Sequence, residues 1–239
     1  MLDQMEVAKK PNTKIWRYMD LYKFEDLLKT RTLYCTQIDR FGDQLEGTRT
    51  QRSFERGMKL WLGRYRNEYQ MGTELAFPSA LHVEDLSRTI SREAIFASCW
   101  HKNKRESAKM WKRYGQAGVA IQSNIGRLLE STKGNEDQFI VHVQSVVYVD
   151  HASDDSDEDE AFIYKDSSYA HEREVRAFVI RIGDRGRSEK PSDFPDRLRP
   201  PCHLETLIVS VHLPPQSQHF DEVRALLDGA ELSHVPIMI

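Results

Sequence analysis

The stretch YKDSSYAHEREVRAFVIRI, residues 164–182, decides how the rest of the chain is interpreted. Its second half has the β-branched and aromatic content of a strand, in which successive side chains point to opposite faces of the sheet. On that alternation Glu172, Glu174 and Arg176 share one face with the apolar residues Phe178 and Ile180. One end of this face is charged and the other is apolar. We therefore expect a strand whose far end is buried and whose near end opens into a cleft with two carboxylates and a guanidinium.

The composition is that of a globular protein with a well-charged surface. Of the 239 residues, 39% are hydrophobic and 30% are charged, a balance unlike that of a disordered chain. The length suits one large domain or two small ones, and we expect a single domain over residues 1–239. No apolar run approaches a membrane span in length, and residues 1–10 lack the apolar core of a signal peptide. The sequence thus predicts a cytoplasmic protein without a membrane partner.

Cysteines and acidic residues give no sign of a metal site. Cys35, Cys99 and Cys202 are far apart and form no Cys-x-x-Cys pair, so reduced structural thiols are expected. The acidic loop at 150–160 lacks the glycine and the spaced ligands of a calcium loop, and we expect it to be solvated. Because this loop concentrates so many acids, the net charge of −3 hides a body that is basic elsewhere.

Helical and strand patterns are interspersed along the chain. Helical spacing is found at 21–29 after the N-cap Asp20, at 50–69, from Ser107, at 124–133, at 162–169 and at 218–227; strand patterns occupy 14–18, 32–36, 95–100, 118–123, 139–149, 206–213 and 233–239. Residues 183–203 are rich in Gly, Pro, Ser and charge, which predicts an irregular excursion. The order has neither regular βαβ periodicity nor a Gly-rich phosphate turn. It favours an α+β fold with a mixed or mainly antiparallel sheet flanked by helices.

Two segments concentrate positive charge. The helix at 50–69 has a basic face apart from its apolar stripe, formed by Arg52, Arg56, Lys59 and Arg66. A solvated surface is the ordinary interpretation of such a face, and contact with phosphate or nucleic acid is the alternative. The second segment, at 101–117, joins two predicted strands and contains six lysines and arginines against the single acid Glu106.

Large aromatic residues accompany the cations of the second segment. Trp111 and Tyr114 are three residues apart, so they lie on one side of the short helix predicted from Ser107. Cations beside two rings suit a flat, anionic ligand, since the cations can hold phosphate and the rings can stack on a base or on nicotinamide. The alternative is that Trp111 and Tyr114 pack the helix on the sheet while the lysines stay solvated.

Several motifs, spread over essentially the whole chain, occur together. They are I-W-R-Y at 15–18, L-x-C-T-x-x-D-R-F-G-D-x-x-E-G at 33–47, M-W-x-x-Y-G-x-x-G-V-A-I at 110–121, Lys165 followed by E-x-E-x-R at 172–176, and V-x-L-P-P at 211–215. In combination they resemble a large bacterial family, domain of unknown function 2971. Membership implies a shared set of motifs and carries no chemistry with it.

The beginning of the chain has a second, more distant resemblance. A strand that ends in Arg17 and Tyr18, an immediate helix and a strand at Leu33 and Tyr34 look like the start of ADP-ribosyltransferase-type domains. Such domains place a basic residue on the first strand and a key glutamate on a late one, so the resemblance implies these roles for Arg17 and Glu174. The chain departs from them in having no clear Ser-Thr-Ser or central tyrosine motif at the corresponding places.

These residues suggest cleavage of the bond between nicotinamide and ribose in NAD. That reaction passes through an oxocarbenium-like sugar, so it needs an anion beside the sugar and cations on the diphosphate. Glu174 is the expected anion, with Glu172 beside it and Lys165 nearby. Two carboxylates on one face raise each other's pKa, which would make one a base and the other an electrostatic stabiliser, with Arg176 opposing protonation of both.

The ligand-binding residues of this hypothesis come from the first strand and the basic connection. Arg17 would hold phosphate, Trp111 or Tyr114 would stack on a ring, and Tyr18 and Arg176 would complete the set. The predicted partner is a small anionic ligand or nucleotide, with NAD as substrate and no metal.

Three alternatives remain open at this stage. A metal-dependent nuclease would use Asp43 or Glu46 together with Glu174, Lys165 and magnesium. A non-catalytic module would bind RNA or a nucleotide through the two basic segments. Finally, the charged face of the strand at 172–176 could be a lateral ion pair at a sheet edge without a function in binding.

Overall fold

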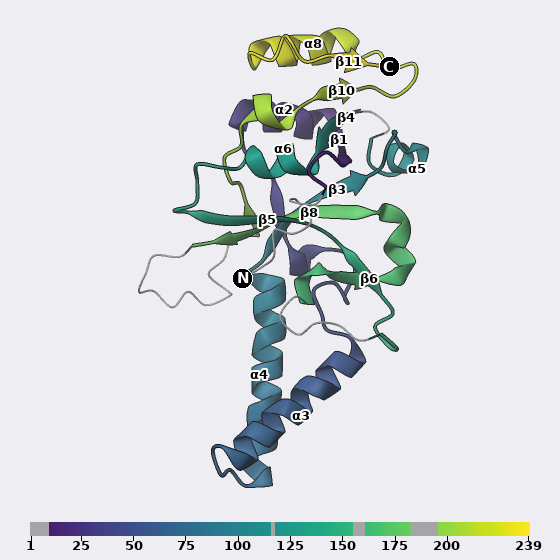
Figure 1. Cartoon of the computed structure of the whole chain (residues 1–239). Helices are drawn as coiled ribbons and strands as arrows, with labels where there is room; N and C mark the ends of the chain where they lie inside the picture. The colour runs from purple at the N-terminus through teal and green to yellow at the C-terminus, as the bar shows by residue number, and fades with distance from the viewer. Residues whose placement is uncertain (1–9, 116–117, 155–160, 183–195) are drawn as a thin grey trace.

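A computed structural model of the chain describes residues 10–115, 118–154, 161–182 and 196–239 (Figure 1). It confirms the predicted α+β class, with a mixed, mostly antiparallel open sheet and helices beside it. The strands of the main sheet are β1 (Lys14–Asp20), β2 (Cys35–Gln37), β3 (Phe96–Lys102), β4 (Gly118–Asn124), β5 (Phe139–Ser145), β8 (Glu174–Arg181), β9 (Arg197–Leu198), β10 (Ser210–His212) and β11 (Ile237–Met238). A separate parallel pair consists of β6 (Val147–Val149) and β7 (Tyr164–Asp166).

The helices are distributed between the sheet and a projecting hairpin. They are α2 (Leu21–Thr30), α3 (Gln51–Asn67), α4 (Thr73–Glu93), α5 (Ala108–Met110), α6 (Ile125–Glu130), α7 (Leu204–Leu207) and α8 (Phe220–Gly229), with short 3-10 segments η1 (Ile38–Arg40), η3 (Ala161–Ile163) and η4 (Ser167–Glu172) and a π-helical turn η2 (Trp111–Gly115). Figure 1 shows α3 and α4 extending away from the sheet, with α8 at the other end of the molecule. None of the helices in the described ranges is long and apolar enough to cross a membrane.

Strand β3 is the centre of the sheet, and its two sides are paired differently. On one side β8 pairs with it from Phe96 to His101. On the other side β1 pairs only at its beginning, where Trp16 faces His101, and β2 pairs only near Ala97. Beyond Trp16, β1 turns away and continues beside β4. The sheet therefore splits between β1 and β2, and residues 98–100 of β3 lie at the bottom of the split.

One face of the sheet forms the main hydrophobic core. Its residues include Ile15 of β1, Phe96 of β3 and Val175 and Ala177 of β8, and α2, α6, α7 and α8 supply the apolar side chains that cover them. Helix α2 begins as the sequence predicts, because the Asp20 carboxylate accepts a hydrogen bond from the amide of Lys23 and caps the first turn. The opposite face is partly covered by η1 and η3 and, over β1 and β4, by Met110 of α5 and Trp111 of η2; part of it lines the cavity described below.

Several predicted elements were wrong in their extent or type. The strand expected at 139–149 is interrupted at Val146, where the chain leaves β5 and enters β6 of the other sheet. The strand expected at 206–213 begins as helix α7, and the helical spacing at 162–169 belongs to η3, β7 and η4. In each segment apolar residues are dense enough to fit either period, so packing decides the conformation. Residues 155–160 of the acidic loop and 183–195 of the irregular excursion lie outside the described residues.

The largest omission from the sequence analysis is α4, for which it predicts no element. This helix contains Pro78 five positions after its first residue Thr73, and proline normally ends or kinks a helix. It packs along α3, where Glu84 of α4 forms a buried ion pair with Arg49, just before α3 (2.6 Å between Nη1 and Oε2). The small Gly57 of α3 allows this approach, since a Cβ there would lie 2.6 Å from the Glu84 carboxylate.

Candidate functional site

A cavity of about 680 Å³ lies over the split in the sheet. Its walls come from β1, β2, β3, β8, η4, the π-helical turn and the loop that follows η1. Aromatic side chains form much of the lining, among them Tyr18, Tyr34, Trp100, Tyr114 and Tyr169. The volume is within the usual range of small-molecule sites, about 300–1,000 Å³.

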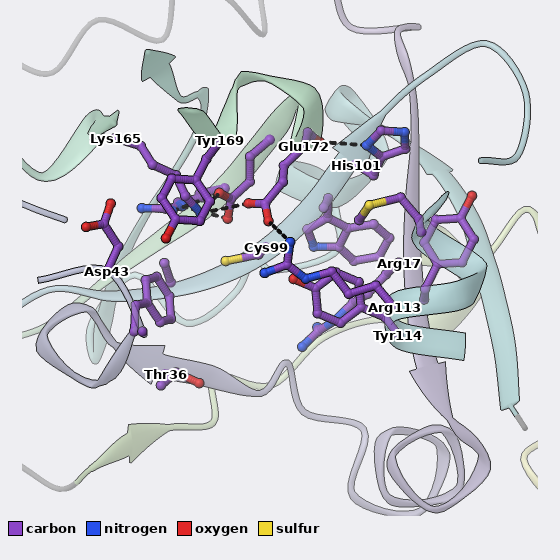
Figure 2. A pocket seen from close by; sticks show the side chains of 18 of the residues that line it. Arg17, Thr36, Asp43, Cys99, His101, Arg113, Tyr114, Lys165, Tyr169 and Glu172 are labelled. Atoms are coloured by element: carbon purple, nitrogen blue, oxygen red, sulfur yellow. Dashed lines mark hydrogen bonds and ion pairs between the residues drawn. The ribbon is translucent and has the colours of Figure 1, made fainter. Parts of the chain in front are cut away.

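Lys165 is the centre of a buried charged cluster in this cavity. Its Nζ atom lies 2.8 Å from Oε2 of Glu172, 3.0 Å from Oε2 of Glu174 and 3.7 Å from Oε2 of Glu46. Glu172 is held from its other side by Arg113, whose Nη1 atom is 2.9 Å from Oε1 (Figure 2). Arg113 is half exposed whereas Glu172 is buried, so this arginine connects the cluster to the rim of the cavity.

Arg176 binds two of the same carboxylates and has no exposed surface. Its Nε and Nη2 atoms donate to the two carboxylate oxygens of Glu174 at 2.9 and 2.8 Å, and Nη2 also contacts Glu46. The guanidinium lies 5.0 Å from the ring centre of Phe41, which closes it off on one side. This bidentate geometry fixes Glu174 more firmly than a surface ion pair would. The predicted position at a sheet edge is wrong, because β8 lies between β3 and β5, whereas the predicted ion pairing of Glu174 with Arg176 is present.

The environment moves the pKa values of the carboxylates in different directions. For Glu174, burial alone would raise the pKa, but Arg176 and then Lys165 outweigh burial and lower it to about 2. For Glu46, burial is the larger effect and raises the pKa despite the same two cations. The expectation that neighbouring carboxylates raise each other's pKa therefore fails for Glu174, which is ionised throughout the neutral range. Two carboxylates with diverging pKa values in one site are a common feature of catalytic centres.

The acidic pair reaches the cluster by a route that strand alternation does not predict. Glu172 ends the 3-10 segment η4, and β8 begins only at Glu174. Arg173 between them has a left-handed backbone with φ of 44°, which is uncommon for a residue other than glycine, asparagine or aspartate. This single residue turns the chain so that both carboxylates contact Lys165. The prediction of a shared location was correct, but its reason was wrong for Glu172.

Arg17 lies in the split between β1 and β2. Its Nη2 atom donates to the backbone carbonyl of Tyr34 at 3.1 Å, and its guanidinium lies 5.7 Å from the ring centre of Trp100. Burial lowers the pKa of this guanidinium. Arg17 lines the same cavity as Lys165, Glu172 and Glu174, and Figure 2 shows it with Lys165 and Glu172. Its hydrogen bond across the split gives it a structural contact besides the phosphate contact predicted for it, which stays a prediction.

The aromatic residues predicted to stack on a ligand separate into two positions. Tyr18 and Tyr114 line the cavity, whereas Trp111 is not among its lining residues. The Trp111 ring packs edge-on against Tyr18 with 5.1 Å between ring centres, and its Nε1 atom donates to Glu106 at 2.8 Å. Trp111 therefore supports a wall of the cavity from behind. Tyr114, which is 44% exposed, has the better position to meet a ligand.

His101 and Cys99 of β3 line the cavity, and the sequence analysis assigned neither to the site. The ring of His101 is buried, and its Nδ1 atom donates to the backbone carbonyl of Glu172 at 2.6 Å. Burial lowers the pKa of His101, so the ring is neutral at neutral pH. The Cys99 thiol hydrogen bonds to Glu174, and burial raises its pKa well above the ordinary value. Cys99 and His101 are two residues apart, so they lie on the same face of β3. That spacing in a predicted strand was the signal that could have identified them.

The acids named for a nuclease also lie at this cavity, with Asp43 and Glu46 among its lining residues. No group of three or more candidate ligands suited to a metal ion occurs in the described ranges. The Lys165 ammonium occupies the point where the three buried carboxylates meet, so a divalent ion there would have to displace it. The donor set as arranged therefore fits an ammonium rather than a metal ion.

Comparisons with protein-family models, with curated proteins and with solved structures found no match. The resemblances to domain of unknown function 2971 and to ADP-ribosyltransferase-type domains thus stay predictions.

Proposed function

We propose that the protein binds NAD or a closely related nucleotide in the cavity over the split and cleaves its bond between nicotinamide and ribose. The observation that supports this proposal is the buried cluster of Glu46, Glu172 and Glu174 around Lys165, at one side of an aromatic-lined cavity with arginines near its opening. Aromatic rings suit nicotinamide and adenine, and arginines suit the diphosphate.

Glu174 is the residue we assign to the charge that develops on the sugar. As the bond between C1′ and the nicotinamide nitrogen breaks, its electron pair leaves with nicotinamide and positive charge spreads over C1′ and the ring oxygen. A carboxylate with a pKa of about 2 remains ionised and stabilises that charge without taking a proton. Because Lys165 and Arg176 fix it from two directions, little reorganisation is needed when the charge appears.

The new bond forms between C1′ and the oxygen of water or of an acceptor hydroxyl. The proton lost by that oxygen is assigned to Glu172, since this carboxylate is linked through Arg113 to the rim of the cavity, where an acceptor would arrive. From the sequence alone, glycosidic and phosphodiester chemistry are both open. The ammonium of Lys165 among the carboxylates favours the glycosidic reaction over the metal-dependent nuclease.

The experiment is an assay of nicotinamide release from NAD by liquid chromatography, with and without EDTA. We expect release that survives EDTA and falls about 100-fold or more in Glu174→Gln, as on removal of one transition-state contact. Glu68→Gln, at the exposed C-cap of α3 where the carboxylate also pairs with an arginine, is the matched control and should leave release unchanged.

Binding has to be measured beside turnover to separate catalysis from folding. The Kd of NAD, by calorimetry, should change only a few-fold in Glu174→Gln if the residue acts mainly in the transition state. Circular dichroism confirms that the variant is folded at the assay temperature. No binding and no release by the folded wild-type protein would refute the proposal, and phosphodiester cleavage abolished by EDTA would favour the nuclease.

A further inference from the structure

A second hollow, which we call the basic groove, lies on the other side of the Glu172–Glu174 segment. Its volume is about 970 Å³, and it is lined by the start of β1, the end of β3, the region of Val146 and Tyr148, and the junction between η4 and β8. Its charged lining consists of Lys14, Lys102, Lys104 and Arg173, with Glu174 as the one acid. The Glu174 carboxylate is directed into the charged cluster, so it does not offset these cations.

Three of the cations are exposed. Lys14, Lys104 and Arg173 are exposed side chains, and within the part of the chain that the structure describes no acid forms an ion pair with any of them. They come from three separate segments, namely the start of β1, the loop after β3 and the junction between η4 and β8, and all line one groove. Convergent cations that face solvent create a positive potential that attracts a polyanion.

The lining of the groove also includes uncharged residues. Tyr148 lines it together with the apolar Val146 and Ala170 and with Asn12 and Asn103. The Tyr148 hydroxyl accepts a hydrogen bond from the backbone N–H of Glu174 at 2.8 Å, which anchors the ring to β8. A fixed ring for stacking, amides for base edges and cations along the sides are the features of a single-stranded nucleic acid site. A phosphopeptide would instead need its cations gathered around one phosphate group.

We propose that the basic groove binds a segment of single-stranded nucleic acid, with its phosphates on Lys14, Lys104 and Arg173 and one base on Tyr148. The E-R-E triplet at 172–174 then lines both sites, with the two carboxylates in the cavity and Arg173 in the groove. Only part of the basic connection takes part, since Lys102 and Lys104 line the groove whereas Arg113 lines the cavity. This proposal goes beyond NAD cleavage and does not depend on it.

Fluorescence anisotropy with labelled single-stranded DNA and RNA of about ten nucleotides tests the electrostatic part. Three phosphate contacts predict a slope of about −2 for log affinity against log salt, at about 0.7 per contact. Lys14→Gln with Lys104→Gln should lower affinity about 10- to 30-fold at 0.1 M salt and bring the slope to about −0.7. Lys29→Gln with Lys133→Gln, two exposed lysines outside the groove, is the control of equal charge and should bind like wild type.

The stacking part is tested with a probe that lacks bases. Tyr148→Leu should lower affinity about five-fold or more, whereas Tyr148→Phe, which keeps the ring, should retain it. Wild type should bind an abasic oligonucleotide more weakly than one with bases. Tyr148→Leu should bind these two oligonucleotides with equal affinity. This pattern separates a stacking role from a structural one.

Several outcomes would overturn the proposal. The first is that wild type binds no oligonucleotide at about 50 mM salt. The second is that the groove variant and the control variant lose equal affinity for the oligonucleotide. The third is that a phosphorylated peptide binds more tightly than the oligonucleotide and depends on the same lysines. Because none of these measurements uses NAD, failure here leaves the assignment of the cavity untouched, and loss of the NAD activity leaves the groove untouched.

Discussion

The charged cluster makes a specific prediction about two chemically identical substitutions. Glu174→Gln and Glu46→Gln each replace a buried carboxylate of the same cluster by an amide of the same shape, and both carboxylates contact Arg176. We expect Glu174→Gln to destabilise the protein strongly and Glu46→Gln to destabilise it less. The reason is that the cations overcome burial at Glu174 but not at Glu46.

The magnitude for Glu174 follows from its pKa. The change from the ordinary 4.5 to about 2 is worth about 3 kcal/mol, at about 1.4 kcal/mol for each pH unit between the unfolded and folded values. Because the folded pKa is the lower one, the ionised carboxylate stabilises the fold above about pH 4.5. That stabilisation is lost as the pH falls from there towards 2. For Glu46 the folded pKa is the higher one, so ionisation opposes folding as the pH rises, and the amide removes that opposition.

Urea unfolding followed by tryptophan fluorescence measures both effects. At pH 7 the free energy of unfolding should drop by about 3 kcal/mol in Glu174→Gln, and this difference from wild type should shrink steadily between pH 4.5 and 2. Glu46→Gln should show a smaller loss at pH 7. If the two variants lose equal stability, or if Glu46→Gln loses more, then the cations do not stabilise the ionised Glu174 more than the ionised Glu46, and the reasoning is wrong.

Other substitutions test the fold outside the cluster. Gly118→Ala should destabilise the protein by more than about 2 kcal/mol in urea unfolding, since an added Cβ would lie 2.0 Å from a backbone oxygen of β1. Gly63→Ala, in α3 with open space around it, should stabilise the protein by up to about 1 kcal/mol. Equal effects of the two substitutions on the free energy of unfolding would refute the packing argument. Asp20→Ala should cost about 1 kcal/mol through loss of the α2 cap while Asp20→Asn costs less, and a reversed order in thermal melts would exclude capping. The Cys35 thiol, buried with a pKa of about 12, should react with a disulfide reagent only after urea unfolding, and rapid reaction of a folded variant that keeps only this cysteine would contradict its burial.

The sequence predicted the fold class because its local signals agree with the tertiary structure. Strands β1, β3 and β4 and helices α2 and α3 were each expected from local patterns, and Asp20 was recognisable as the cap of α2. Where the prediction failed, tertiary contacts outweighed local preference. Helix α4 is stabilised along α3 in spite of Pro78, and β6 leaves the line of β5 to pair with β7.

The candidate site was predictable in its members more than in its geometry. Glu172, Glu174, Lys165 and Arg176 were singled out from one stretch of sequence, and they do meet in one cluster. The left-handed turn at Arg173 could not be anticipated, since no glycine or asparagine marks it. Trp111 lies behind the wall because its ring is used in packing against Tyr18, a choice that helical spacing alone does not reveal.

The split in the sheet also has a consequence for backbone hydrogen exchange. Residues 98–100 of β3 pair with β8 on one side, whereas on the other side neither β1 nor β2, as far as the described residues extend, pairs with them. Amides without a ladder partner exchange through smaller openings than amides within a ladder. We therefore expect the β3 amides that point towards Arg17 to exchange rapidly and those that point towards β8 to exchange slowly, as measured by deuterium uptake. A ligand that fills the cavity would slow exchange along that one edge, so a single strand would report occupancy before any substrate is identified.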